Sequence, residues 1–255
     1  LSGIFRHFSR LKDEDIGPGE YLRWAQKQTT NNKQQRIEKR EIEKWDELAG
    51  AYQKYEELKV KESVMDFSDL IANTLKLFRQ RQNILKEYQE KFKYILVDEY
   101  QDTNIAQNEI VKLIAGEKAN LTVVADDDQS IYRWRGASFS NVIQFRESFP
   151  QAKIVTLVQN YRSTQEVLDH AYKLIQNNNP DRLEVREGIN KKLISVRKIK
   201  GEKPEFIYTD RVENEAEAVA KKILQLIKEE DYDFFDFAIL VRANSSAEPF
   251  TRALA

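Results

Sequence analysis

The sequence contains no cysteine, only two histidines (His7 and His170) and eight glycines among its 255 residues. Without cysteine there can be no disulfide framework, thiol nucleophile, or cysteine-ligated zinc or iron–sulfur centre, and two distant histidines do not favour a histidine-rich metal site. No apolar run approaches the ~18 residues that a membrane helix needs, and Leu1 opens no signal-peptide pattern. We therefore expect a soluble, cytoplasmic protein with no membrane partner.

The chain also lacks an excess of either charge, with 41 Lys+Arg against 42 Asp+Glu and a net charge of −1. No global cationic field attracts nucleic acid, so any site for a polyanion must be local. Residues 95–128 hold eight acids and two bases, a balance typical of a cation site. Residues 182–203 hold eight bases and three acids, which predicts either a solvated loop or a contact with a phosphate backbone.

Residues 1–63 have no β-branched run and are rich in Glu, Lys, Gln and Arg, which predicts an entirely helical segment. Polar or Gly-Pro breaks are expected at 17–19 and 29–32. Between residues 33 and 62, apolar side chains recur every three or four positions, as on an amphipathic helix: Trp45, Leu48, Tyr52, Tyr55 and Leu58. Asp66 is placed to cap a further helix that runs to about Gln80.

The second part of the chain alternates short apolar runs with helical patterns. The expected strands are 94–97, 121–124, 154–158, 205–208 and 237–241, and the expected helices are 104–115, 138–148, 164–177 and 213–229. Such alternation is typical of parallel sheets with helical crossovers. The sequence therefore predicts an α/β protein, with parallel sheets flanked by helices after an N-terminal all-helical subdomain.

The first candidate site follows the expected strand 94–97, where the sequence reads Asp98-Glu99-Tyr100-Gln101-Asp102. Ligands bind at the carboxyl ends of strands in open α/β sheets. A carboxylate there can hold hydrated Mg²⁺ that bridges nucleotide phosphates, and Glu99 can orient or deprotonate an attacking water. A strand that simply ends in a polar turn is the alternative interpretation.

The second candidate site, residues 125–137, follows the expected strand 121–124 and should lie beside the first. It combines acids with Gln129, Tyr132, Trp134 and Arg135. Aromatic rings interleaved with arginine suit single-stranded nucleic acid, because bases stack on the rings and guanidinium groups pair with phosphates. Alternatively, the two aromatic residues are part of the core.

The third candidate site, residues 159–164, comes after the expected strand 154–158 and before a helix. Arg162 can neutralise charge on a transferring phosphoryl group, and Tyr161 can stack on a nucleobase. The alternative is a helix N-cap at Ser163 with an incidental Tyr-Arg pair.

Together these three motifs resemble the UvrD/Rep/PcrA family of superfamily 1 DNA helicases. Residues 98–102 are similar to the family's Walker B motif, 126–137 to GDxxQSIYxxRGA, and 159–163 to QNYRS. Weaker similarity lies at 66–71, 215–216 and 240–244, and the resemblance runs from about residue 50 to the end. It implies RecA-like motor domains: a 1B-like helical insertion at 1–63, the C-terminal part of the first motor domain at 64–150, and the front of the second at 151–255.

The resemblance also implies roles for single residues. Asp98 would bind Mg²⁺, Glu99 would be the catalytic base, and Gln129 would sense the γ-phosphate of ATP. Tyr161 would stack on adenine and Arg162 would contact the γ-phosphate. Three further residues would face single-stranded DNA: Tyr132, Trp134 and Arg135. The family couples ATP hydrolysis to movement on single-stranded DNA, typically 3′ to 5′, so single strands, duplex junctions and DNA repair are the expected partners and context.

The sequence departs from the family pattern in several places. It has no Gly-x-x-x-x-Gly-Lys-Ser/Thr loop to cradle phosphates, and the family's last two motifs are missing. Ala125 replaces the usual Gly, and Glu248 and Thr251 differ from the residues of relatives. We therefore expect an internal segment of a helicase that is inactive alone. A helicase-like DNA-binding or docking module without ATPase activity, and a subunit of a helicase–nuclease, are the alternatives.

Overall fold

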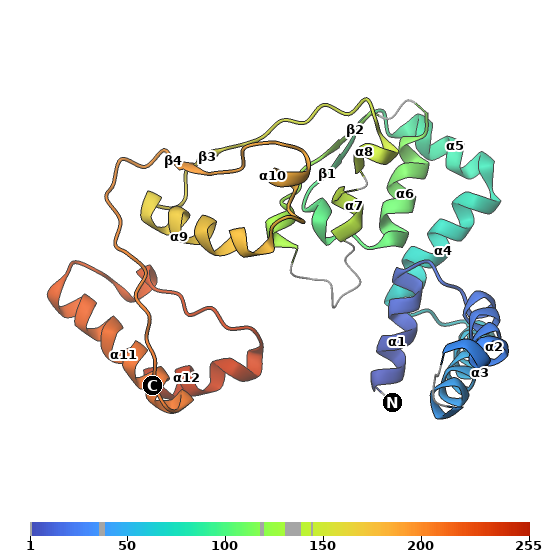
Figure 1. Cartoon of the computed structure of the whole chain (residues 1–255), viewed down its shortest axis with the longest axis horizontal. Coiled ribbons are helices and arrows are strands. Elements are labelled where there is room, and N and C mark those ends of the chain that lie inside the picture. The colour runs from blue at the N-terminus through green and yellow to red at the C-terminus, as the bar shows by residue number, and fades with distance from the viewer. Residues whose placement is uncertain (1, 36–38, 118–119, 131–138, 144) are drawn as a thin grey trace. The chain divides into compact units, whose positions relative to one another are not determined.

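The computed structural model describes every residue except 1, 36–38, 118–119, 131–138 and 144, and it forms two compact units (Figure 1). Unit 1 comprises residues 1–157 and 178–191, and unit 2 comprises residues 158–177 and 192–255. The chain therefore enters unit 2, returns to unit 1 for fourteen residues, and enters unit 2 again. The assignment of 1–63, 64–150 and 151–255 to helicase subdomains stays a prediction.

Unit 1 begins with the expected helical segment. Its helices are α1 (Ser2–Asp13), α2 (Pro18–Gln35) and α3 (Lys39–Glu62). A break is present but lies earlier than the predicted 17–19: it spans 14–17, and α2 begins at Pro18. The predicted break at 29–32 is wrong, because α2 continues to Gln35. Polar residues such as Thr and Asn lower helix propensity by only a few tenths of a kcal/mol each, roughly, which a continuous helix tolerates.

These three helices share one apolar core, made mainly of aromatic and small side chains. Its buried members are Phe8, Leu11, Tyr21, Ala25, Ala49 and Tyr52. The rings of Phe8 and Tyr52 stack with centroids 4.8 Å apart. The predicted stripe on α3 is confirmed for Trp45, Leu48, Tyr52 and Tyr55, which lie in or against this core, whereas Leu58 is 53% exposed.

Two more helices follow, α4 (Phe67–Gln80) and α5 (Gln82–Lys91). The predicted N-cap is confirmed: the Asp66 carboxylate accepts from the Asp69 amide at 2.9 Å, and the Asp69 carboxylate accepts from the Asp66 amide at 2.8 Å. This reciprocal capping box satisfies backbone donors that a helix start leaves unpaired. It therefore fixes the direction in which α4 leaves the helical region.

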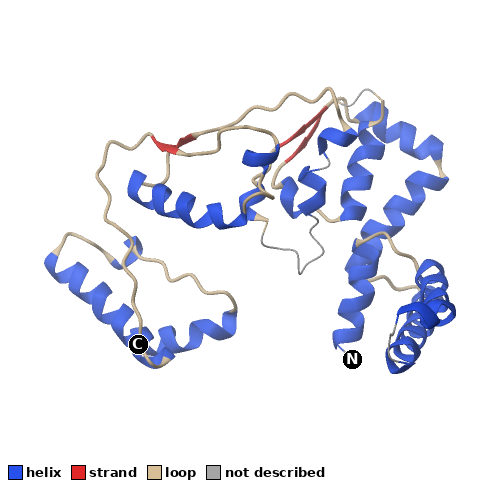
Figure 2. Ribbon diagram, viewed as in Figure 1, coloured by secondary structure: helices blue, strands red, loops and turns tan. Residues whose placement is uncertain are grey.

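A two-stranded parallel sheet forms the part of unit 1 that carries the first two candidate sites (Figure 2). Strand β1 (Ile95–Val97) pairs with β2 (Leu121–Val123) in the register Ile95↔Leu121 and Val97↔Val123. Helix α6 (Ile105–Ala115) lies between them in sequence, as the predicted crossover requires. Both strands therefore end at the same edge of the sheet.

Shorter helices complete unit 1: α7 (Phe139–Ile143), α8 (Phe145–Ser148) and α10 (Leu183–Arg186). Sequence predicted one helix over 138–148, and the structure has two short ones there. Asn141 in the middle of α7 is buried and donates to the backbone oxygens of Thr103 and Asn104, at 3.0 and 3.2 Å. It ties α7 to the segment that follows β1.

Unit 2 contains a second small parallel sheet and three helices. Strand β3 (Gln159–Asn160) pairs with β4 (Ile194–Ser195), and the helices are α9 (Gln165–Ile175), α11 (Val212–Glu229) and α12 (Glu248–Leu254). Helices α9 and α11 confirm the helices predicted at 164–177 and 213–229.

Three predicted strands, at 154–158, 205–208 and 237–241, are wrong: these residues form no strand. A strand needs a neighbour for its backbone hydrogen bonds. Near 154–158 the β3–β4 pairing takes in only the Val158 oxygen, which accepts from the Ile194 amide at 2.8 Å, and no described strand pairs with 205–208 or 237–241. Their apolar side chains are consequently exposed, at 88% for Phe206 and 93% for Leu240. An apolar run in the sequence does not show whether a second strand will lie beside it.

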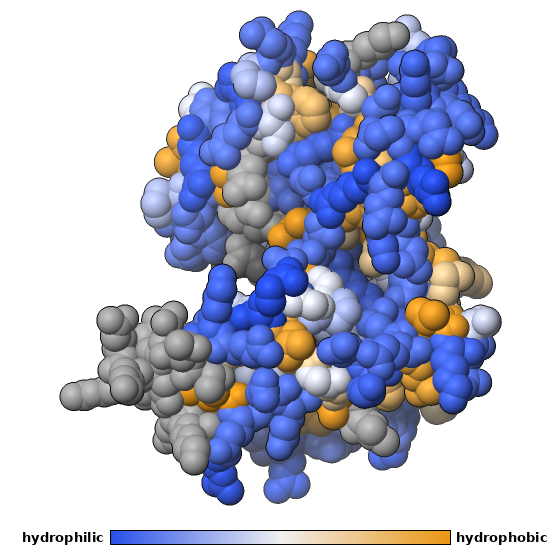
Figure 3. All heavy atoms as spheres, turned by 90° about the vertical axis from the view of Figure 1, so that its right-hand side faces the viewer, coloured by the Kyte–Doolittle hydropathy of each residue, from blue (hydrophilic) through white to orange (hydrophobic). Residues whose placement is uncertain are grey.

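The molecular face over α2, α3 and α5 is mostly hydrophilic, with apolar patches scattered between charged side chains (Figure 3). Among the described residues, none of the helices is both long enough and apolar enough to cross a lipid bilayer.

Candidate functional site

The shared edge of β1 and β2 carries the first candidate site. Backbone hydrogen bonds continue past the strands, from the Val124 amide to the Val97 oxygen at 2.8 Å and from the Tyr100 amide to the Val124 oxygen at 2.9 Å. Asp98 and Glu99, the first residues beyond β1, both have exposed side chains. The sheet therefore presents two carboxylates to solvent where its strands end.

Glu99 adopts a left-handed backbone conformation, with φ 49° and ψ 41°. A residue with a Cβ occupies this region at a cost of roughly 1–3 kcal/mol unless its surroundings hold it there. Here the Asp98 carboxylate accepts from the Glu99 amide at 3.0 Å, and the Glu99 carboxylate accepts from the Gln101 side-chain amide at 2.6 Å. The carboxylate of Glu99 thus has a defined direction.

Tyr100 anchors this turn in the core. Its side chain is 1% exposed, its hydroxyl donates to the Asn108 side-chain oxygen on α6, and burial raises its pKa to about 12. Its ring lies edge-on to Phe145 of α8, with centroids 5.6 Å apart. The short turn that begins at Tyr100 is therefore held from two sides.

The second candidate site begins with an acidic turn that we define as Asp126, Asp127 and Asp128. The Asp126 carboxylate accepts from the Asp128 amide at 3.2 Å and from the Gln129 side chain at 2.8 Å. The Asp126 amide donates to the Gln101 side-chain oxygen at 3.0 Å. Gln101 is 1% exposed, so a buried side-chain amide bridges the acidic turn to Glu99.

Basic side chains from the segment 178–191 form ion pairs with the acidic turn. Arg182 binds Asp128 through two parallel contacts of 2.7 Å, and Lys191 Nζ lies 2.8 Å from Asp126 and 3.0 Å from Asp128 and also contacts Asp127. The Arg182 side chain is only 3% exposed. The expectation of a solvated loop or a phosphate contact is therefore wrong for Arg182 and Lys191.

These ion pairs shift the pKa values of both partners. Burial alone would raise the pKa of Asp128, but hydrogen bonds from Arg182 and Lys191 outweigh it and lower that pKa. The hydrogen bonds to Asp128 raise the pKa of Arg182. Burial would lower the pKa of Lys191, but its carboxylate partners raise it. These directions favour the charged forms of Asp128, Arg182 and Lys191.

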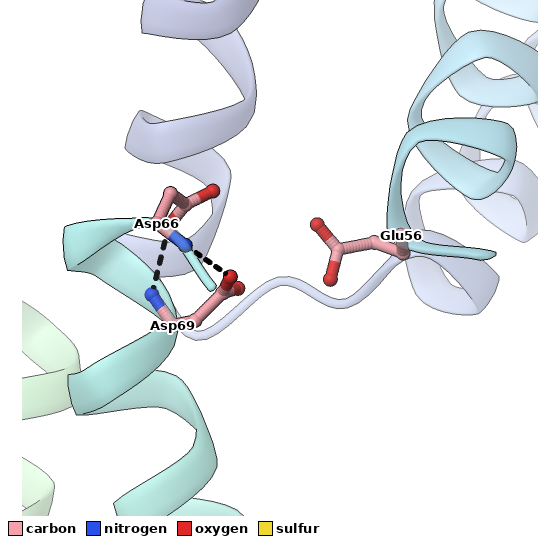
Figure 4. Close-up of side chains that lie close together, drawn as sticks. All are labelled: Glu56, Asp66 and Asp69. Carbon is pink, nitrogen blue, oxygen red and sulfur yellow. Dashed lines mark hydrogen bonds between the residues drawn. The ribbon is translucent and has the colours of Figure 1, made fainter. Parts of the chain in front are cut away.

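A second group of carboxylates lies in the helical region of unit 1: Glu56, Asp66 and Asp69 (Figure 4). Their oxygens are close enough to ligate a metal ion, but two buried ammonium groups already contact them. Lys12 Nζ lies 2.6 Å from Asp69, and Lys59 Nζ lies 2.6 Å from Asp69 and 2.8 Å from Glu56. The group is therefore an ion-pair cluster that joins α1, α3 and α4.

The third candidate site lies in unit 2. Tyr161 is 70% exposed, and its hydroxyl donates to the Gln159 side chain at 2.8 Å. The alternative of a Ser163 N-cap is wrong, because the cap residue of α9 is Thr164. Instead, the Asn160 side chain accepts from the amides of Arg162 and Ser163 at 3.0 and 2.8 Å. This turn leaves the side chains of Tyr161 and Arg162 exposed.

The structure thus brings Asp98, Glu99 and Gln129 together in unit 1 and places Tyr161 and Arg162 in unit 2. The predicted DNA-facing residues Tyr132, Trp134 and Arg135 lie outside the described residues. The sequence did not predict that Gln101, Arg182 and Lys191 contribute contacts to the group in unit 1. The only signal for the two bases was the opposite charge of the segments 95–128 and 182–203.

Comparison with known proteins supports a common origin for the whole motif set. Residues 12–150 match the UvrD/REP helicase N-terminal domain, and residues 155–255 match the UvrD-like helicase C-terminal domain. ATP-dependent DNA helicase PcrA of Leuconostoc citreum is 41% identical over 208 residues, which cover 81% of this chain and 27% of that protein.

Two further relatives are similar at the same level. DNA helicase II of Rickettsia typhi is 41% identical over 202 residues, covering 79% of this chain and 30% of that protein. ATP-dependent DNA helicase Rep of Buchnera aphidicola is 36% identical over 231 residues, covering 91% of this chain and 34% of that protein. The chain thus spans about a quarter to a third of the length of these relatives.

Proposed function

This chain belongs to the UvrD/REP helicase family, and we propose that the protein that carries it is an ATP-dependent DNA helicase. In this proposal, ATP hydrolysis drives movement along single-stranded DNA in the 3′-to-5′ direction and opens duplex junctions. DNA repair as the process and the cytoplasm as the location belong to the same proposal and rest on the family relationship.

One structural observation supports the proposal most directly. Strands β1 and β2 are paired in register, and the residues that follow them, Asp98–Glu99 and Asp126–Gln129, come to one edge of one sheet. The carboxyl end of a parallel sheet is where nucleotides bind in open α/β proteins. Two sequence motifs separated by more than twenty residues therefore contribute to one site.

The chemistry of Asp98 fits a metal ion that accompanies the nucleotide. Mg²⁺ takes one or two carboxylates and otherwise binds waters and phosphate oxygens. Asp98 is exposed, and within the described residues its carboxylate contacts a backbone amide and no lysine or arginine. The two acidic clusters found among the described residues of unit 1 already contain ammonium or guanidinium partners. Asp98 is therefore the carboxylate that we assign to Mg²⁺.

The remaining roles follow from geometry and charge. Glu99 is exposed and its carboxylate is held in one direction by Gln101. We assign it the role of general base, which accepts a proton from the water that attacks the γ-phosphate of ATP. Gln129 donates to Asp126, which is linked to Glu99 through Gln101, and would report the γ-phosphate. Arg162 and Tyr161 in unit 2 would contribute a cation for the transferring phosphoryl group and a stacking surface for adenine. Tyr132, Trp134 and Arg135 remain assigned to single-stranded DNA.

The test is Glu99→Gln in the complete natural protein. The amide keeps the shape and accepts the hydrogen bond from Gln101, but it cannot accept a proton, so binding of ATP and DNA should persist while steady-state hydrolysis falls at least ~100-fold. Glu90→Gln, at an exposed site on α5, is the matched control and should hydrolyse ATP at the wild-type rate. Near-normal hydrolysis by Glu99→Gln would show that the base is another residue.

A further inference from the structure

The acidic turn Asp126–Asp128 presents a chemical problem that its local sequence does not solve. Three carboxylates have oxygens within 4.8 Å of one another, and the Asp127 side chain is 1% exposed. Like charges at this separation repel strongly unless a cation lies between them. Either a divalent metal ion or a basic side chain can reduce this repulsion.

In this protein a lysine takes the central position. Lys191 Nζ contacts a carboxylate oxygen of all three acids, and its side chain is only 15% exposed. Arg182 completes the arrangement by a bidentate contact with Asp128, a geometry that holds both groups in one plane. Both bases come from the segment 178–191, more than fifty residues further along the chain.

The same segment binds the turn through its backbone. The Leu183 amide donates to Asp127 at 2.8 Å, and the Lys191 amide donates to Glu184 at 3.0 Å. Glu184 also accepts from Arg182 at 2.7 Å. The segment is therefore a closed arrangement of charge-assisted contacts, in which each carboxylate of the acidic turn has a fixed partner.

The contacts continue from the acidic turn to the proposed catalytic residues. One oxygen of Asp126 accepts from Lys191 and the other accepts from Gln129, each at 2.8 Å. The amide of Asp126 donates to Gln101, whose side-chain amide donates to Glu99 at 2.6 Å. Because Gln101 is buried and bonded at both ends, we infer that a shift of Asp126 would change the direction of the Glu99 carboxylate.

We propose that Lys191 is the built-in cation of the acidic turn, in the place of a metal ion, and that Lys191 and Arg182 are positioning residues for Gln129 and Glu99. Only the second half of this inference, the positioning role of Lys191 and Arg182, rests on the proposed function. Its first half, that an ammonium group occupies a potential cation position, stands on the geometry of unit 1 alone.

The first measurement concerns the cation position and needs no ATP. In the complete natural protein, Lys191→Met removes the ammonium and leaves three close carboxylates, so Mn²⁺ should bind there and raise the thermal unfolding temperature by roughly 2–4 °C. The wild-type protein should not show this Mn²⁺-dependent rise in unfolding temperature. Neither should the control Lys192→Met, which alters the neighbouring half-exposed lysine. Equal responses to Mn²⁺ in all three proteins would overturn the first half of the proposal.

A second variant keeps the test decisive if Lys191→Met does not fold. Lys191→Met/Asp127→Asn removes one charge of each sign, should be more stable than the single variant, and should bind Mn²⁺ more weakly because one ligand is neutral. A double variant that is no more stable than Lys191→Met would show that charge balance is not what Lys191 provides.

The second measurement concerns positioning and uses DNA-stimulated ATP hydrolysis. Lys191→Met should lower kcat roughly 10- to 100-fold and leave the KM for ATP within about twofold, because the base is misdirected while the nucleotide still binds. Lys191→Arg keeps the charge and should restore most of kcat, whereas Lys192→Met should resemble wild type. An unchanged kcat in folded Lys191→Met would overturn the positioning role. Absence of hydrolysis by the wild-type protein would instead refute the proposed function, and the Mn²⁺ measurement would still decide the first half.

Discussion

Replacement of Lys12 by methionine should destabilise unit 1 strongly, because Lys12 is a buried cation with three anionic partners. Its ammonium lies 2.6 Å from Asp69, 2.7 Å from Asp66 and 3.0 Å from Glu56, and its side chain is 4% exposed. Two ammonium groups and three carboxylates give the cluster a net charge of −1, which the variant changes to −2. Methionine retains the length of the side chain, so the lost charge dominates the effect.

The expected magnitude follows from the local dielectric. A pair of unit charges at 4 Å gains about 4 kcal/mol at an effective dielectric constant of 20, and desolvation offsets much of that gain. When the ammonium group is removed, the buried carboxylates still pay their desolvation penalty but lose the attraction that offset it. We therefore expect Lys12→Met to lower the free energy of unfolding by about 3–5 kcal/mol.

A surface ion pair of the same length provides the control. Lys54 and Glu57 on α3 lie 2.7 Å apart, but their side chains are 80% and 50% exposed, so Lys54→Met should cost less than about 1 kcal/mol. Urea unfolding gives both values, and hydrogen exchange of the α1 and α4 amides shows where the loss occurs. Lys12→Met/Asp66→Asn, which restores the net charge and keeps a good N-cap residue, should recover part of the loss. If Lys12→Met cost no more than Lys54→Met, the reasoning from burial would be refuted.

Three further predictions concern pH, catalysis and the chain alone. Burial raises the pKa of Asp13 to about 6, from an ordinary value of 3.8. The contribution of this carboxyl group to stability is therefore present below pH 3.8 and is lost as the pH rises through 6. Asp13→Asn should stabilise the protein by about 1–2 kcal/mol at pH 7.5 and should not stabilise it at pH 3.5, as measured by urea unfolding at the two pH values. Arg162→Ala in the complete natural protein should reduce ATP turnover by ~10³-fold, since it removes a cation from the transferring phosphoryl group, and steady-state hydrolysis within tenfold of wild type would contradict that role. The purified 255-residue chain should release no phosphate from ATP with or without DNA, because it lacks the glycine-rich loop and its lysine; DNA-stimulated release that Glu99→Gln abolishes would disprove this.

The local features of this protein follow from patterns within short stretches of its sequence. Helix α4 begins where Asp66 can cap it, and α9 and α11 occupy the segments that their periodicity predicts. The strands β1 and β2 end immediately before the acidic motifs that define the candidate site. These outcomes depend on hydrogen bonds and apolar spacing within a few residues, which a sequence pattern contains directly.

The pairing of distant charges and the choice of partner for each apolar segment depend on how the whole chain folds. Lys12 pairs with Asp69 across 57 residues, and Arg182 pairs with Asp128 across 54, whereas the sequence predicted a solvated loop or a phosphate contact for the second base. The apolar run at 205–208 has strand composition and yet forms no strand. Ion pairing and sheet formation both need a second segment of chain at a set distance, and composition carries no information about that distance.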